Sequence, residues 1–192
     1  MYYDYDGTAW AAVLVSIFVG LLIGVAIYIV TAIFLRKVFE KAGVANPNVA
    51  WIPIYNYLLF AKLGDLNPLI ALGGIVLSVI PILNYVSWIV TLGVHVAIAY
   101  RVNLKLQKDP VAFTIFGVLL APIWLGVIAF GQGVWNTASK PVAGVAPVPP
   151  PPWATQTWLM DTTTWGGVPF QGYAATPPAA PTTPPPATPP AA

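Results

Sequence analysis

The chain has 192 residues, of which 58% are apolar and only 7% carry a charged side chain. Charged residues make up about 25% of an ordinary soluble domain, so this composition excludes that class and indicates a membrane protein. The net charge of +2 argues against nucleic-acid binding, and the absence of cysteine excludes disulfides and thiolate metal sites.

The first predicted element is a transmembrane helix over residues 10–36. Its apolar stretch contains no charged residue before Arg36, and about 20 apolar residues suffice to cross a hydrocarbon core of about 30 Å. Residues 1–9 are predicted to form a short external N-terminus. Asp4 and Asp6 stand where a signal peptide would have basic residues, so we expect this helix to be retained.

This first helix carries small residues at four-residue spacing, namely Ser16, Gly20 and Gly24. Small residues let helix backbones approach closely within lipid. The pattern therefore predicts a helix-packing face, either toward another helix of this chain or toward a partner, and we favour packing within the chain.

A short motif occurs twice, as IPIYNY at residues 52–57 and as IPILNY at residues 80–85. Proline and asparagine in this order are typical of a turn, whereas six residues are weak grounds for an internal duplication or a binding motif. The first copy lies in a predicted cytoplasmic loop, residues 37–67. Its aromatic residues indicate that segment 49–61 lies in the inner membrane interface.

The second copy divides a long apolar region. A single helix over residues 69–100 would be about 48 Å long, which exceeds one ordinary crossing. We therefore predict a helical hairpin of two transmembrane helices, residues 68–83 and 84–101. The hairpin places every basic group of the loops on one face, the cytoplasmic one by the positive-inside rule. Five of these groups are predicted to meet lipid headgroups: Arg36, Lys37, Arg101, Lys105 and Lys108.

A cytoplasmic loop, residues 102–109, leads to a fourth predicted transmembrane helix over residues 110–132, with a kink at Pro122. Asn67-Pro68 and Asp109-Pro110 each supply a capping side chain followed by proline, which predicts two helix starts. The predicted fold is thus an all-α membrane protein with four transmembrane helices, one inner-interface helix and an extended Pro-rich tail. Both termini are expected on the external side of a bacterial plasma membrane.

Ser87, Thr91 and His95 lie four residues apart and form a polar stripe on one face of the third helix. Polar groups at membrane depth usually face protein or a water-filled cavity. A haem ligand or a proton relay through His95 is the sharper hypothesis. A neutral His95 that is hydrogen-bonded to a neighbouring helix is the interpretation that we favour, because no acidic residue lies in a predicted span.

The sequence predicts no catalytic residue, no cofactor and no metal site. The carboxylates are scattered, and no nucleophile motif or phosphate-binding loop is present. An enzyme that acts on lipids at the inner interface near Lys62 and Asp65 is the least favoured of three functional hypotheses.

Most of the 21 prolines lie in residues 141–192, a tail that we predict to be extended and external. A solvated spacer gains nothing from aromatic side chains, so those of the tail predict a docking segment for a partner or for the membrane surface. These residues are Trp153, Trp158, Trp165, Phe170 and Tyr173.

The stretch LRKVFEKAGVANPNVAWIPIYNYLLFAKLG, followed by VIPILN, resembles a family of small multi-pass bacterial membrane proteins of unknown function with an IPIYN-type segment. Some members of that family are fused to signal peptidases. The resemblance covers residues 34–131 and is strongest over residues 37–56. It implies a bacterial source and brings no activity and no catalytic residues.

From these features we expect a non-catalytic integral membrane protein. The leading hypothesis is an accessory or scaffolding subunit of a larger bacterial membrane complex. Its partners are expected to be membrane lipids and other membrane protein subunits, with the tail as the docking segment, and no nucleic acid. The alternative is a small oligomeric transporter or channel that uses the polar stripe of the third helix.

Overall fold

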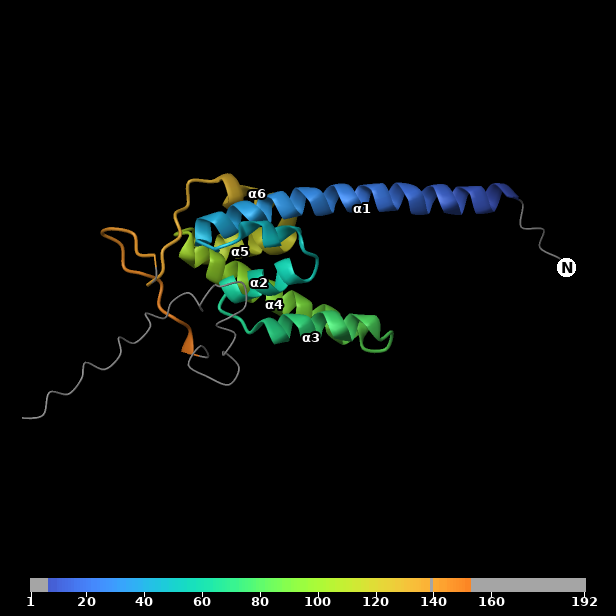
Figure 1. Ribbon diagram of the computed structural model, residues 1–192. Helices are drawn as coiled ribbons and strands as arrows, with labels where there is room; N and C mark the ends of the chain where they lie inside the picture. Colours follow the sequence, from blue (N-terminus) through green and yellow to red (C-terminus); the bar gives the residue numbers. More distant parts are fainter. Residues whose placement is uncertain (1–6, 139, 153–192) are drawn as a thin grey trace, which may run out of the picture.

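The computed structural model describes residues 7–138 and 140–152, and these residues form helices joined by short connections (Figure 1). The predicted all-helical class is confirmed: no strand occurs in these two ranges, although Thr137 makes isolated bridges to Lys140 and Val148. The elements in chain order are α1 (Gly7–Ala42), η1 (Pro47–Trp51), α2 (Tyr55–Leu63), α3 (Pro68–Val79), α4 (Asn84–Lys105), α5 (Pro110–Leu119) and α6 (Ala121–Phe130).

Helix α1 has 36 residues and is therefore about 54 Å long. Its second half packs into the helical body, where Ala32, Val38 and Phe39 are fully buried. Its first half projects away from the body (Figure 1), and residues 9–27 are all exposed. Among the residues that the structure describes, two helices have the length and apolar composition to cross a membrane, α1 from Ala9 onward and α4.

Helices α3 and α4 form an antiparallel pair that turns at residues 80–83, within the second IPI copy. Asn67 caps the start of α3, because its side chain accepts a hydrogen bond from Leu69 N at 2.9 Å. Across the pair, Ser87 Oγ donates to the carbonyl of Gly74 at 2.7 Å. The absence of a side chain at Gly74 allows this close approach, since a Cβ there would lie 3.1 Å from Thr91 Oγ1.

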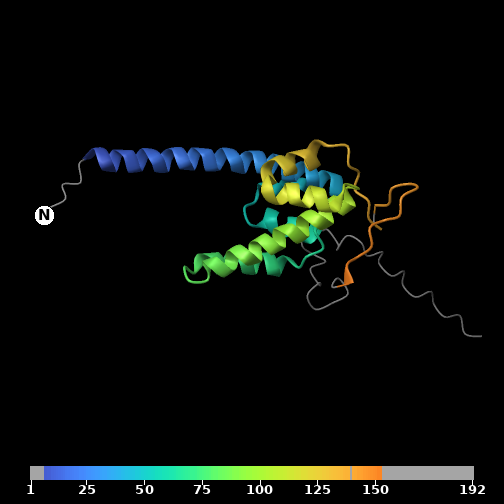
Figure 2. The same cartoon turned by 180° about the vertical axis from the view of Figure 1, so that it is seen from behind.

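Our prediction of a single helix over residues 110–132 is wrong. The segment forms α5 and α6, two ten-residue helices that reverse direction at Leu120, whose backbone leaves the helical region at φ −133° and ψ 51° (Figure 2). The arms pack tightly, because a Cβ on Gly117 would lie only 2.9 Å from Cδ2 of Trp124. Each arm is about 15 Å long, which is half of a hydrocarbon core.

The predicted interfacial position of residues 49–61 does not fit residues 58–61, which are buried inside the helical body. Helix α2 lies in the centre of the body, with Leu59, Phe60 and Ala61 buried. The preceding η1 segment runs back along α1, so that the Tyr28 hydroxyl donates to the carbonyl of Trp51. Tyr28 lies about 21 Å before the end of α1. The chain then reverses and returns through α2.

The first IPI copy forms this reversal. Ile54 has a φ of 65° and a ψ of −56°, and Tyr55 N donates to Pro53 O at 2.7 Å, which together define a strained three-residue γ-turn. The buried Asn56 side chain donates to Ala50 O at 2.9 Å and holds the turn closed. Both copies of the motif are therefore turns, built with different geometries.

The charged side chains gather at one end of the body, which we call the basic end (residues 36–43, 62–67, 101–109 and 131–140). Contacts join its four parts: Lys140 Nζ donates to Lys41 O at 2.8 Å, Asn136 N to Lys105 O at 2.7 Å, and Lys105 Nζ to Asp65 at 2.7 Å. The turns at 80–83 and at Leu120 point the opposite way, in the direction of the N-terminus of α1 (Figure 2).

Candidate functional site

The polar stripe of α4 faces its neighbouring helices. Ser87 donates to the backbone of α3, as described above, and His95 Nε2 lies 3.1 Å from Gly117 O on α5. A carbonyl oxygen can only accept, so the His95 proton of this bond is on Nε2. The His95 ring also meets the Trp124 ring edge-on, with 5.9 Å between centroids. Two of the three stripe residues thus join helices within the chain.

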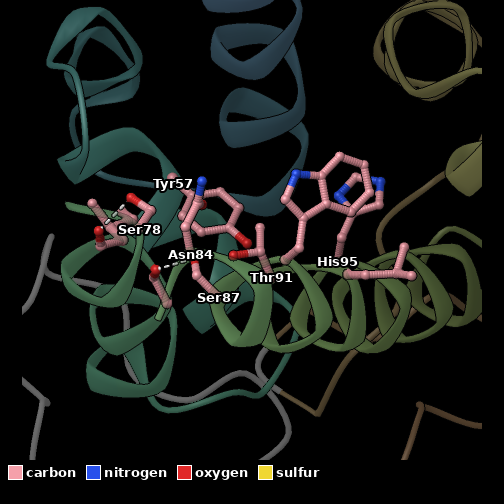
Figure 3. Close-up of a pocket in the computed structure, with 10 residues that line it drawn as sticks. Tyr57, Ser78, Asn84, Ser87, Thr91 and His95 are labelled. Carbon is pink, nitrogen blue, oxygen red and sulfur yellow. Dashed lines mark hydrogen bonds between the residues drawn. The ribbon is translucent and has the colours of Figure 1, made fainter. Parts of the chain in front are cut away.

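Thr91 and the rest of the stripe line a pocket between α2, α3 and α4, with a volume of about 440 Å³. Figure 3 shows Tyr57 of α2 and Thr91 of α4 pointing toward one another across it. Ser78 and Asn84 lie toward the α3–α4 turn, and His95 closes the other end.

The chemistry that the pocket offers follows from its lining. Its lining includes no carboxylate, lysine or arginine, so a general acid-base pair is not assembled there. In the described residues, no group of three His, Cys, Asp or Glu side chains is placed to hold a metal ion.

A second cluster lies at the basic end and is buried. Asp65 sits in the α2–α3 turn, and its carboxylate accepts from Arg101 Nε at 2.7 Å and from Lys105 Nζ at 2.7 Å. Lys105 also donates to Leu63 O at 2.7 Å and lies 5.7 Å from the centroid of the Trp135 ring. Two cations thus share one carboxylate in the protein interior. Through these contacts the cluster, which we call the fastening point, holds α2, α4 and the C-terminal segment together.

This burial corrects the predicted lipid-headgroup residues. The side chains of Arg101 and Lys105 are only 8% and 0% exposed, so they do not reach a membrane surface. Arg36 and Lys37 are about half exposed and pair with Glu40 on α1. Lys108 Nζ lies over the Phe113 ring at 5.6 Å. The headgroup interpretation is therefore retained for Arg36, Lys37 and Lys108 alone.

Lys62 is a third buried cation at this end, with no exposed surface. Burial lowers its pKa to about 8 from the ordinary value near 10.5. The helix period accounts for the position of Lys62 at the end of α2, but it does not account for the burial of this residue. The sequence signal that could have suggested it is the run YLLFAKLG, in which Lys62 follows several apolar residues.

Residues 131–149 fold over the helix ends that form the rest of the basic end. Trp135, Asn136 and Thr137 are almost completely buried, and Asn136 N donates to Lys105 O at 2.7 Å. The Asn136 side chain donates to Ala146 O at 2.9 Å and accepts from Val142 N at 3.1 Å. Arg101 donates to Pro149 O at 2.8 Å. The predicted start of a separate tail at residue 141 is therefore too early, since packing continues to Pro149.

The small-residue face of α1 packs against no other helix of the described chain. A Cβ at Gly20 or Gly24 would meet nothing within 4 Å, and Ser16 Oγ donates to Ala12 O of its own helix at 2.8 Å. Of the two alternatives for this face, packing within the chain is not made by the residues that the structure describes.

The aromatic residues predicted to dock a partner lie outside the described residues; they are Trp153, Trp158, Trp165, Phe170 and Tyr173. Comparison of the chain with protein-family models, with curated proteins and with solved structures finds no match.

Proposed function

We propose that this chain is a non-catalytic integral membrane protein that serves as an accessory or scaffolding subunit of a larger bacterial membrane complex. The observation that carries the proposal is the set of contacts that residues 131–149 make with α4 and α1. Asn136, Lys140 and Pro149 attach this segment to α4 and α1, so a tail that follows it would start from one defined place on the helical body. The exposed small-residue face of α1 offers a second surface, to another membrane subunit.

The proposed topology differs from the predicted one at its C-terminal end. In it α1 and α4 cross the membrane, the shorter α3 lies beside α4, and the basic end is cytoplasmic by the positive-inside rule. The 15 Å arms of α5 and α6 enter the bilayer and return to the same side. Residue 131 then lies beside Lys41, and the tail leaves on the cytoplasmic side with the N-terminus external.

Copurification with a matched truncation tests this function. Tagged full-length protein and a form that ends at Pro152 are purified from native membranes in mild detergent, and the accompanying proteins are identified by mass spectrometry. The Pro152 form keeps the contacts that attach the C-terminal segment, so it separates tail docking from folding of the body. We expect a defined set of membrane proteins with the full-length chain only. Two forms that both purify without partners would contradict the proposal.

A third form keeps the tail but replaces its five aromatic side chains with serine. If the aromatic residues dock the partner, this form behaves like the truncation. If it retains the full set of partners, another part of the tail makes the contact.

The transporter or channel hypothesis is less well supported. The pocket favours it, but Ser87 and His95 are each bonded to a backbone carbonyl of a neighbouring helix. Under that hypothesis a His95→Ala variant loses flux in reconstituted vesicles, and normal flux in this variant would exclude the polar stripe as a route.

A further inference from the structure

The Tyr57 hydroxyl is a buried polar group that has no hydrogen-bond partner within residues 7–138 and 140–152. The phenol comes from α2 and points toward Thr91 across the pocket (Figure 3). An unsatisfied donor in a low-dielectric site is costly, and in the bilayer core it costs several kcal/mol. The pocket therefore calls for an occupant that accepts a hydrogen bond from Tyr57.

The lining of the pocket restricts the charge of this occupant. No acidic side chain, lysine or arginine reaches it, and most of the surface comes from apolar groups such as Ile75, Trp88 and Leu92. Ionic ligands need a paired charge when they leave water. The volume of about 440 Å³ is within the usual range for small-molecule sites. The ligand is therefore small, uncharged and largely apolar.

The mouth of the pocket indicates where the ligand comes from. Trp88 and Leu92 stand at its edge on α4 and are 72% and 44% exposed. Because α4 can cross a membrane, these exposed side chains face hydrocarbon in a bilayer. A ligand that enters past them must be dissolved in the membrane.

We propose that this pocket binds an uncharged, lipid-soluble molecule through a carbonyl oxygen that accepts a hydrogen bond from Tyr57. Thr91 supplies a second hydroxyl beside it, and Gly74 keeps the space open next to Thr91. Two sources have this chemistry, the ester carbonyl of a membrane glycerolipid and the ring carbonyl of a lipophilic quinone. The proposal concerns the pocket alone and does not depend on the scaffolding function.

The test uses the full-length protein in nanodiscs of ether-linked phospholipid, which contain no ester carbonyl. Dioctanoylglycerol and a quinone with a ten-carbon tail are titrated separately, and the thermal unfolding midpoint and the Kd from tryptophan fluorescence are measured. We expect one probe to bind saturably and to raise the midpoint. Which probe does so identifies the source of the carbonyl.

Matched variants then locate the site. Tyr57→Phe keeps the ring and removes the donor, and it should weaken binding about fivefold to tenfold. Thr91→Val should also weaken binding. Tyr85→Phe changes an exposed tyrosine outside the pocket and should leave the Kd unchanged. The proposal is overturned if neither probe binds, or if Tyr57→Phe binds as tightly as Tyr85→Phe. The unfolding midpoint of each variant without ligand shows whether it is folded.

Discussion

Lys105 Nζ donates to the Asp65 carboxylate at 2.7 Å and so joins the end of α4 to the turn between α2 and α3. The same carboxylate accepts from Arg101 through its other oxygen. A single acidic residue, in a left-handed backbone conformation with φ 58°, thus neutralises part of a buried basic cluster. The body is held together at this end by charge as well as by apolar packing.

Removal of this carboxylate should strongly destabilise the protein. Asp65→Asn leaves Arg101 and Lys105 buried without their counter-charge, and such a change costs about 3–5 kcal/mol. Glu40→Gln is the control, because Glu40 pairs with Arg36 and Lys37 on an exposed face and should cost less than about 1 kcal/mol. Thermal unfolding in detergent measures both. Equal midpoints for the two variants would show that the buried cluster is not a fastening point.

The pH dependence of stability should reveal Lys62. Its pKa is about 8 in the folded protein and near 10.5 when it is unfolded, so between these values the unfolded chain binds more protons. Stability contributed by this group therefore rises as the pH rises from about 8 to about 10.5, with a slope of at most about 1.4 kcal/mol per pH unit.

Lys62→Met isolates this contribution, because every other titrating group is common to both proteins. Unfolding midpoints are measured from pH 7 to pH 10.5. We expect the midpoint of the parent protein to rise relative to that of Lys62→Met as the pH increases over this range. Parallel curves would mean that Lys62 is not buried as a cation.

The γ-turn at Ile54 should be relieved by glycine. An isoleucine with a positive φ is strained, and its side chain is half exposed, so little burial is lost. We expect Ile54→Gly to raise the unfolding midpoint. Ile52→Gly, two residues earlier at an ordinary φ of −93°, should lower it. The reverse order of the two midpoints would place the turn elsewhere.

The close contact of α5 with α6 should not tolerate a side chain at Gly117. A Cβ there would lie 2.9 Å from Trp124, so Gly117→Ala should cost about 1–3 kcal/mol through overpacking. Gly93→Ala on α4 is the control, because a Cβ at that position meets nothing within 4 Å and alanine favours the helix. Denaturation in a mixed detergent series compares the two. A neutral Gly117→Ala would argue for a straight helix over residues 110–132.

Cysteine labelling should show on which side the C-terminal segment lies. The chain has no native cysteine, so Tyr2→Cys, Ala45→Cys and Ala143→Cys each introduce a single reactive thiol. With a membrane-impermeant maleimide, Tyr2→Cys should react in intact cells. Ala45→Cys and Ala143→Cys should react only after permeabilisation. Labelling of Ala143→Cys in intact cells would instead support the external position of the tail that the sequence alone predicts.

Local signals allowed several elements to be predicted from the sequence. The caps at Asn67 and Asp109 accept from Leu69 N and Ala112 N, as the Asn-Pro and Asp-Pro pairs indicate. Both IPI copies form turns, because proline and asparagine restrict the backbone at their own positions and those of their neighbours. Composition by itself predicted a membrane protein, since so few charged residues could not cover a soluble surface, and the long apolar runs predicted helices.

Tertiary structure alone decided which segments are buried and which way the chain runs after α4. The reversal at Leu120 depends on Trp124, which fits against Gly117 and donates from Nε1 to Asn103 at 3.0 Å. Arg101 is buried because its counter-charge is supplied by Asp65, 36 positions away. Hydrophobic periodicity and loop charge are properties of the segment in which a residue lies. Burial of a cation depends instead on a partner that only the folded chain brings into contact.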